Sequence, residues 1–599
     1  MRLEKTVYPL EYCVYLAPNL SSLTFAGTVN VKCHTTSPRS EITLNCADLL
    51  LSTCSINGVP CEYTLEPDLE RLVITAQKEL TGNFLIEIAF TGIHNDRMHG
   101  FYASTYEYTT KDTRNVSTRV MVSTQCQATH CRRVFPCFDE PAFKAVFNVR
   151  VKTPNGYTAL SNMHTTSEPN LNEDSNDSHL VEFAPTPLMS TYLFAVVVAE
   201  LGYIEKQSAS GTLCRVYTPP GLQDQGWFSM TVCIWALDFF SEHFGPFPLT
   251  KLDMVSIPDF TGYAMENWGL MLFKPLILLC DSSTSPTAKR ELAGVVSHEV
   301  AHQWFGNLVT LEWWNATWLN EGFATYAGWL AVDVLFPSWD IWTFYIIDDL
   351  ANALQLDALE TSHAVDTKVA NTSWQINAVF DAISYSKGAA LIVMLSEHLG
   401  ISTFMHGVRA YIQANQYANC TSHELFQCLA RESGVDVVKM MDRWTTVKGF
   451  PLITVHDESY DSNTKEMHLI VSQEPFYAGG CRGDTDADQQ PWAIPIQIGL
   501  GNGRRHACFF STARSTLTFP LESCDAFYKL NDLKTGMYRT LDTRGHTRSL
   551  GECISKQNMP CADRIGVLSD VFALCKGGYL PTTDFLDLAL CFSRETDHL

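Results

Sequence analysis

Residues 298–302 read HEVAH, and Glu321 follows His302 after eighteen intervening residues, within the run WLNEG. On a helix, His298 and His302 are one turn apart and face the same way, so both imidazoles can reach one metal ion. Glu299 lies about 100° around such a helix, where it can act as a general base on a water at the metal without binding the metal itself. Two histidines and a glutamate leave one tetrahedral position of zinc open, which is typical of a catalytic site. The pattern predicts a helical catalytic domain with one Zn²⁺ per chain, bound by His298, His302 and Glu321.

A chance match on a core helix is the alternative interpretation of this pattern. With 18 histidines in 599 residues, HExxH arises by chance in on the order of a few per cent of chains of this size. The residues around the pattern are apolar, so the helix is expected to be buried, and buried polar side chains need a purpose. These flanking residues are Ala293, Val295, Val296, Val300, Ala301 and Phe305. The zinc interpretation is therefore preferred.

Length and composition describe a multidomain globular protein. At 599 residues the chain is too long for one hydrophobic core, and its 46% hydrophobic and 18% charged residues are ordinary for a folded protein. The formal net charge is −23, with 65 acidic and 42 basic residues. Such an excess of negative charge argues against a large phosphate-binding surface. Nucleic acid is therefore not expected as a partner.

The cysteines and the chain start favour a reducing compartment. Residues Met1 to Lys5 carry no apolar segment of a secretory leader, and the longest apolar stretch, around 188–203, is too short and too polar to span a bilayer. The 20 cysteines are scattered without CxxC pairs, which fits reduced thiols better than a disulfide framework. We expect a cytoplasmic protein without a membrane span.

Four stretches differ in hydrophobic period. Residues 1–205 alternate polar and apolar in short runs such as 28–31 and 147–151, which predicts an antiparallel β domain. Longer helical periods follow over 206–450, including 387–399. Strand-like runs return over 451–545, at 452–455, 494–498 and 515–519, and predict a small β-sandwich. Residues 546–599 are expected to form a linker and two helices. The predicted fold class is multidomain α+β.

The residues around the histidines resemble a known family. The block 304–324, WFGNLVTLEWWNATWLNEGFA, is similar to the zinc aminopeptidases of the gluzincin clan, and so are FPCFDEP at 135–141, AMENWG at 264–269 and FDAISYSKGA at 380–389. The runs LNCADL and TPLMSTYLFAVVV look most like the cytosolic puromycin-sensitive aminopeptidases. This resemblance implies a thermolysin-like catalytic domain over 206–450. It also implies the start of a helical C-terminal domain.

The resemblance further implies a function and its residues. The chain would be a zinc metallo-aminopeptidase that releases single residues from peptides with a free N-terminus. Glu266 would bind the substrate's α-ammonium group, and a carboxylate suits that task because it compensates a cation held near Zn²⁺. Gln127 matches the second ammonium contact. Tyr385 matches the tyrosine whose neutral phenol donates a hydrogen bond to the developing oxyanion. The peptide would lie along the stretch Tyr263, Ala264, Met265, Glu266 and Asn267.

Three departures from the family pattern bear on activity. Tyr263 stands where the family usually has glycine, and a large phenol there could reshape the passage for the peptide. His130 and Cys131 replace the usual Asp-Ala ahead of two arginines. Only residues 562–599 match the helical C-terminal domain. The alternative is therefore a catalytically weak, aminopeptidase-like pseudoenzyme that binds peptides, or a truncated isoform with an open site. An endopeptidase is a third possibility, which Glu266 argues against. The sequence does not indicate an oligomeric state.

Overall fold

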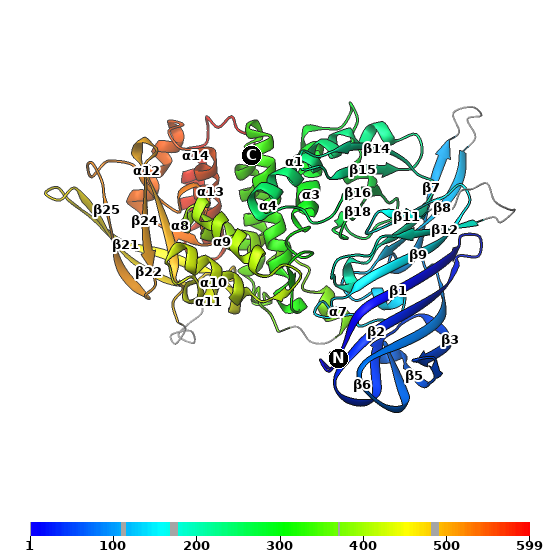
Figure 1. Cartoon of the computed structure of the whole chain (residues 1–599). Coiled ribbons are helices and arrows are strands. Elements are labelled where there is room, and N and C mark those ends of the chain that lie inside the picture. The colour runs from blue at the N-terminus through cyan, green and yellow to red at the C-terminus, as the bar shows by residue number, and fades with distance from the viewer. Residues whose placement is uncertain (1, 110–115, 168–177, 369–371, 481–489, 599) are drawn as a thin grey trace. The chain divides into compact units, whose positions relative to one another are not determined.

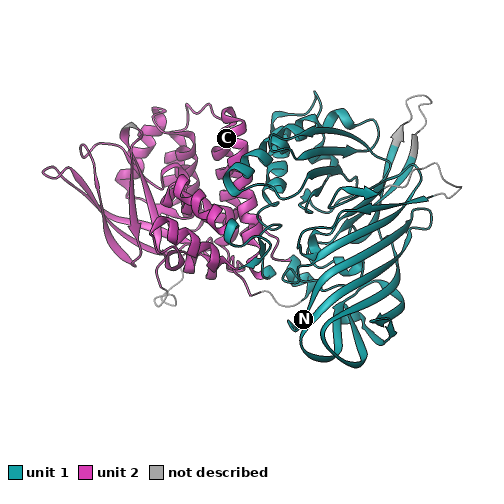
Figure 2. Ribbon diagram, in the orientation of Figure 1, with its two compact units in different colours: residues 1–314, 369–377, 412–420 teal, residues 315–368, 378–411, 421–599 magenta. Residues whose placement is uncertain are grey.

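The computed structural model describes residues 2–109, 116–167, 178–368, 372–480 and 490–598. The chain divides into two compact units, which Figure 2 shows in different colours. Unit 1 comprises Met1–Trp314, Val369–Asn377 and Ile412–Cys420, and unit 2 comprises Asn315–Lys368, Ala378–Tyr411 and Thr421–Leu599.

The first part of unit 1 is built from strands, as the alternating sequence predicts, and most of them pair antiparallel, whereas β1 and β9 pair in parallel. Buried and partly exposed residues alternate along β1, where Tyr12, Val14 and Leu16 face the core, because successive side chains of a strand point to opposite faces. Figure 1 shows β1, β2 and β6 side by side, in the strand order β11-β12-β9-β1-β2-β6-β3-β4 with β5 on β6. The strands of this sheet are β1 (Val7–Asn19), β2 (Thr24–Asn45), β3 (Leu49–Ile56), β4 (Val59–Pro60), β5 (Glu62–Glu66), β6 (Arg71–Ile93), β9 (Val146–Pro154), β11 (Thr165–Ser167) and β12 (Ser178–Phe183). A second sheet, in the order β10-β13-β8-β7, contains β7 (Gly100–Thr109), β8 (Val116–Gln125), β10 (Thr158–Ser161) and β13 (Val196–Ala199).

The second part of unit 1 is a mixed sheet with helices. The sheet has the order β14-β15-β16-β18-β17, and β15, β16 and β18 are parallel neighbours. All residues of β16 are buried, as expected for a central parallel strand. The elements are β14 (Gly202–Gln207), β15 (Leu213–Thr218), α1 (Trp227–Phe244), β16 (Lys251–Ser256), β17 (Ala264–Met265), β18 (Leu270–Phe273), α2 (Pro275–Leu278), α3 (Pro286–Ala301), β19 (Thr310–Leu311), α7 (Ser373–Asn377) and β20 (Asn419–Cys420). The short edge strand β17 carries the AMEN stretch.

Unit 2 begins with helices. Its α4 and α8 approach closely at two glycines: a Cβ on Gly322 would lie 2.8 Å from the main-chain carbon of Gly388. The absence of both side chains lets the two backbones come together. The helices are α4 (Trp318–Leu335), α5 (Ile341–Tyr345), the π-helical turn η7 (Ile346–Leu350), α6 (Ala351–Asp357), the π-helical turn η8 (Ile383–Lys387), α8 (Gly388–Leu399), α9 (Ile401–Ala414), α10 (Ser422–Ser433) and α11 (Val437–Thr446).

The rest of unit 2 is a pair of small sheets followed by three helices. The sheets have the orders β25-β22-β21-β27 and β24-β23-β26. Helices α12 and α13 contribute Leu550, Ile554, Val567 and Val571 to one apolar cluster. The elements are β21 (Pro451–Asp461), β22 (Glu466–Pro475), β23 (Ile494–Leu500), β24 (Arg505–Phe510), β25 (Arg514–Pro520), β26 (Tyr528–Leu530), the short turn η10 (Asp532–Lys534), β27 (Arg539–Leu541), α12 (Arg544–Ser555), α13 (Cys561–Lys576) and α14 (Thr582–Leu590).

The observed elements confirm the multidomain α+β fold class, whereas the domain boundaries at 205, 450 and 545 stay predictions. The stretch expected as a linker contains α12. Helix α12 is a third helix beside the two that were expected, and three helices can enclose a core that two alone cannot. Among the described residues, no single helix is apolar and long enough to cross a membrane. Only Ile383–Leu399 (η8 with α8) and α9 taken together, with a bend of 118° between them, have the length and composition of a span.

Candidate active site

Helix α3 presents the HEVAH residues at its C-terminal end. The helix starts at Pro286, and the hydroxyl of Ser285 caps it by accepting the N–H of Ala288. Glu299 and His302 are buried, and the Nε2 atoms of His298 and His302 lie 2.9 Å apart. His302 Nδ1 lies 2.8 Å from the carbonyl oxygen of Phe305. Since a carbonyl can only accept, this contact places the proton on Nδ1 and leaves a lone pair on Nε2. His302 can therefore offer Nε2 to a metal ion, and the Nε2 of His298 lies beside it.

Glu321 completes a set of metal-binding atoms. It lies in the first turn of α4 and is buried. The nitrogens of His298 and His302 and a carboxylate oxygen of Glu321 all lie within 4.8 Å of one another. Two neutral imidazole nitrogens and one carboxylate are a donor set that zinc prefers for catalysis. These residues therefore fit the zinc ion predicted from the sequence.

Two amide side chains fasten the AMEN stretch to the end of α3. The Nε2 of Gln303 donates to the main-chain oxygens of Glu266 and Glu299, at 3.1 Å each, and its Oε1 accepts the N–H of Gly269 at 3.2 Å. Asn307 Nδ2 donates to the same oxygen of Glu266 at 2.8 Å. All these groups are buried, so the bonds are shielded from water. The position of Glu266 is thereby fixed relative to the helix that carries the histidines.

Glu266 and Gln127 lie together, as expected for two residues that bind one group. Gln127 Nε2 donates to Glu266 Oε1 at 3.0 Å, and the Glu266 side chain is only 3% exposed. Met265 and Asn267 are also buried, so they contribute to the inside of unit 1.

Tyr263 differs from its buried neighbours. Its side chain is 58% exposed, and Tyr263 is not one of the described non-glycine residues with a positive φ. A side chain is therefore tolerated where the family pattern has glycine. The following residue, Ala264, is half-buried and pairs with Phe273 in β18. The effect of the phenol on the passage for the peptide stays a prediction.

Tyr385 lies in the π-helical turn η8, between residues that are held firmly. The hydroxyl of Ser386 donates to Asp349 Oδ1 at 2.9 Å. Lys387 forms a fully buried ion pair with Asp357 at 2.7 Å. Tyr385 itself is half-buried, so its phenol is partly accessible. Single π-helical turns occur frequently at functional sites. In this turn, Tyr385 precedes Ser386 and Lys387, whose side chains are bound by Asp349 and Asp357.

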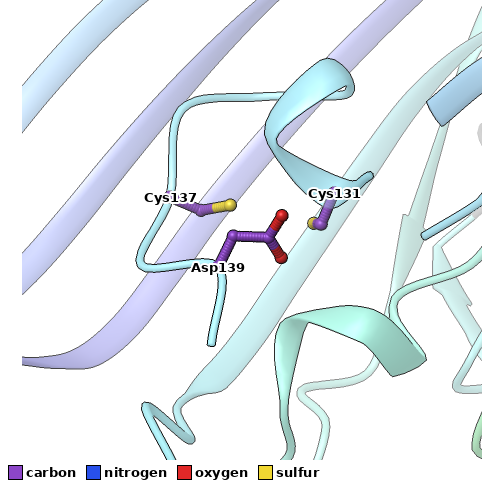
Figure 3. A group of neighbouring side chains, drawn as sticks. All are labelled: Cys131, Cys137 and Asp139. Carbon is purple, nitrogen blue, oxygen red and sulfur yellow. The ribbon is translucent and has the colours of Figure 1, made fainter. Parts of the chain in front are cut away.

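A second group of possible metal ligands, Cys131, Cys137 and Asp139, is buried in unit 1 and appears in Figure 3. The carboxylate of Asp139 is already occupied: Arg132 Nε donates to Oδ2 at 2.9 Å, and the hydroxyl of Thr191 donates to Oδ1 at 2.8 Å. Burial raises the pKa of the Cys137 thiol to about 11 and that of Cys131 well above its ordinary value. A carboxylate whose two oxygens accept hydrogen bonds from Arg132 and Thr191 indicates that Asp139 belongs to a structural network of hydrogen bonds.

The replacement of the usual Asp-Ala by His130 and Cys131 is absorbed within this network. The ring of His130 stacks on that of His99 with centroids 4.2 Å apart. Burial lowers the pKa of His130 to about 3, so the imidazole is neutral. Arg132 keeps its ion pairs with Asp139 and Glu70.

Several residues that support the site were not identified from the sequence. Gln303 and Asn307 bind the main-chain oxygen of Glu266, which lies 37 and 41 residues earlier in the sequence, and no local pattern marks such bonds. Asp381 and His363, which form an ion pair at 3.0 Å beside η8, carried a partial signal because Asp381 lies within FDAISYSKGA.

Comparison with known families covers most of the chain. Residues 228–444 match the Peptidase family M1 domain, residues 8–193 match the Peptidase M1 N-terminal domain, and residues 527–599 match the ERAP1-like C-terminal domain. The last match begins at residue 527, so the expected start of the C-terminal similarity at residue 562 was wrong. The zinc-ligand pattern, the AMEN stretch and Tyr385 all lie in the first of these regions.

Known aminopeptidases align with the whole chain. Aminopeptidase M1-A of Oryza sativa subsp. japonica is 38% identical over 615 residues, which cover 100% of this chain and 67% of that protein. Aminopeptidase M1 of Arabidopsis thaliana is 35% identical, over 100% of this chain and 68% of its own length. The alanine/arginine aminopeptidase of Saccharomyces cerevisiae is 35% identical, over 99% and 68%. With its zinc-ligand set and these similarities, the chain belongs to the peptidase M1 family of zinc metallo-aminopeptidases.

Proposed function

We propose that this protein releases one residue at a time from the free N-terminus of peptides, with Glu266 and Gln127 binding the α-ammonium group. The observation that carries the proposal is the attachment of Glu266 to α3. Gln303 and Asn307 hold the main chain of Glu266, whose carboxylate would bind the ammonium group, and Gln303 joins it to the main chain of Glu299. A site so built accepts a peptide only with its amino end first.

His298, His302 and Glu321 would hold one zinc ion per chain. When bound, zinc polarises the scissile carbonyl and lowers the pKa of water at the site. The Nδ1–H bond of His302 to Phe305 orients this ligand and sets its tautomer.

Glu299 is proposed as the general base and acid. Its carboxylate takes a proton from the attacking water as the oxygen forms a bond to the carbonyl carbon. It then delivers that proton to the departing amine as the carbon–nitrogen bond breaks. The phenol of Tyr385 donates a hydrogen bond to the oxyanion that develops at the carbonyl. The shortened peptide and one free amino acid are the products.

The main chain of the peptide is proposed to pair with β17. This strand lies at the edge of its five-stranded sheet, and an edge strand presents unpaired N–H and C=O groups that can bind an extended peptide. The exposed side chain of Tyr263 precedes β17, so it is placed to contact the first residues of the substrate.

Glu299→Gln provides the test against a binding-only protein. We expect wild-type protein loaded with zinc to hydrolyse alanyl and arginyl fluorogenic amides, and Glu299→Gln to lose at least about 100-fold in kcat, within the range for a general base, while keeping its zinc. Zinc content by atomic absorption and the rate of amide hydrolysis are the two measurements. A zinc-loaded wild-type protein that binds peptides without turnover would favour the pseudoenzyme instead.

We also propose a cytoplasmic location and peptides as the main partners, without nucleic acid. The net charge of −23 supports the exclusion of nucleic acid, and the scattered cysteines, which are free thiols in the described part of the chain, support a reducing compartment. The likeness to the puromycin-sensitive subgroup rests on the two sequence runs alone. Fractionation of cells tests the cytoplasmic location. Inhibition of the purified activity with puromycin tests the likeness to the puromycin-sensitive subgroup.

A further inference from the structure

Asp381 holds the turn that carries Tyr385. Its Oδ1 accepts the N–H groups of Ile383 at 3.0 Å and Ser384 at 3.3 Å, at the start of η8. The N–H of Tyr385 donates to the main-chain oxygen of Asp381 at 3.1 Å. One residue thus satisfies three N–H groups of this turn, as a helix cap does. Any movement of Asp381 would move the backbone of Tyr385.

His363 holds Asp381 in turn. Its Nε2 lies 3.0 Å from Asp381 Oδ2, the oxygen that does not cap the turn. Its Nδ1 lies 2.8 Å from the carbonyl oxygen of Ala364. Because both ring nitrogens face acceptors, the doubly protonated ring satisfies them best. The bond to Asp381 raises the pKa of His363 above its ordinary value, which favours the same charged form.

The residue before His363 secures the far end of the turn. The hydroxyl of Ser362 donates to Asp357 Oδ1 at 2.7 Å, and Asp357 pairs with Lys387 inside the protein. The charged groups that face His363 are therefore Asp381 and, with opposite sign, Lys387 beside its partner Asp357. Two successive loop residues thereby attach to both ends of η8.

We propose that His363 is a positioning residue, which holds the Asp381 carboxylate and thereby fixes the phenol of Tyr385 where the oxyanion forms. The inference rests on the role proposed above for Tyr385. A hydrogen-bond donor to an oxyanion acts only when it is placed in advance, and a displacement of about 1 Å can cost on the order of 100-fold in rate. His363 would not touch the substrate.

A double-mutant cycle distinguishes positioning from a general contribution to folding. Zinc-loaded full-length protein is assayed with an alanyl fluorogenic amide, as wild type, His363→Ala, Tyr385→Phe and the double variant. We expect Tyr385→Phe to lower kcat by about 100-fold, as for other oxyanion donors, and His363→Ala to lower it by roughly 10-fold with little change in KM. In the Tyr385→Phe background, His363→Ala should change kcat by less than about 2-fold, because the residue it positions has lost its donor.

Two further variants keep the test decisive. Asp381→Asn retains an oxygen that can cap the turn but loses the ion pair with His363. It should therefore lower kcat as much as His363→Ala does. It replaces His363→Ala in the cycle if that variant does not fold. His406→Ala changes an exposed histidine of α9 in the same unit and should leave kcat unaltered. Equal losses from His363→Ala in both backgrounds, or no loss in the wild-type background, would overturn the inference. An unchanged kcat in Tyr385→Phe alone would instead refute the proposed role of Tyr385.

Discussion

Replacing Glu266 by glutamine removes the charge that is proposed to bind the substrate's ammonium group, while the local structure is kept. In the wild-type protein, Gln127 Nε2 donates to Glu266 Oε1 at 3.0 Å. The amide oxygen of a glutamine at position 266 can still accept this bond. The bonds from Gln303 and Asn307 reach the main-chain oxygen and do not depend on the side chain. The variant should therefore fold and bind zinc normally.

The expected loss of kcat/KM follows from the burial of Glu266. With only 3% of the residue exposed, its carboxylate binds a cation in a site largely shielded from water. A hydrogen bond to a charged group contributes about 1.5–3 kcal/mol, and about 1.4 kcal/mol corresponds to a factor of ten. Glu266→Gln should thus lower kcat/KM for an unblocked alanyl amide by roughly 10- to 150-fold.

The assay needs a matched control. Glu205→Gln alters a carboxylate on β14, at the opposite edge of the same sheet, where Glu205 pairs with Arg215 at 3.1 Å in a partly exposed setting. We expect this control to keep kcat/KM within about 2-fold, because exposed ion pairs contribute little. A Glu266→Gln protein with normal zinc content and wild-type kcat/KM would refute the assignment of Glu266 to the ammonium group.

Three further predictions concern stability. Asp570→Asn should lower the free energy of unfolding by about 3–5 kcal/mol in urea titrations. The substitution leaves the buried cations Lys534 and Arg539 without their anion. A loss below about 1 kcal/mol, typical of an exposed pair, would contradict this prediction. Gly388→Ala should destabilise the protein in thermal unfolding, because the added Cβ would meet Gly322 at 3.2 Å, and an unchanged Tm would count against the tight crossing of α4 and α8. The loss of unfolding free energy caused by His363→Asn should be largest below the ordinary histidine pKa of about 6.5 and should shrink as pH rises through the raised pKa of His363. A loss that grows with pH would show that Asp381 does not hold the charged ring.

Much of the fold could be predicted from periodicity, because burial leaves a regular trace in the sequence. Alternating residues predicted the strands at 28–31 and 147–151, which lie in β2 and β9. The helix of the HEVAH pattern is α3. The stretch from residue 546 was expected to begin with a linker, but most of α12 lies there, and its sequence RGHTRSLGECIS is polar and contains two glycines. Its few apolar residues nevertheless pack into a core with two later helices.

The zinc ligands could be predicted because one helical turn fixes two of them, but the supporting contacts could not. Gln303 and Asn307 bind main-chain oxygens, which every residue carries, so their partners leave no signal in the sequence. The π-helical geometry around Tyr385 depends on long-range bonds from Ser386 and Lys387 to unit 2 carboxylates. Such contacts appear only when the chain is folded.

The central claim, that this zinc site cleaves only from a free amino end, is tested most directly by mass spectrometry of one peptide offered in two forms. Zinc-loaded wild-type protein is incubated with the peptide carrying a free N-terminus and with its N-acetylated twin. We expect the free peptide to give a ladder of products that each lack one more N-terminal residue, and the acetylated peptide to stay intact. Internal cleavage of the acetylated peptide would contradict it.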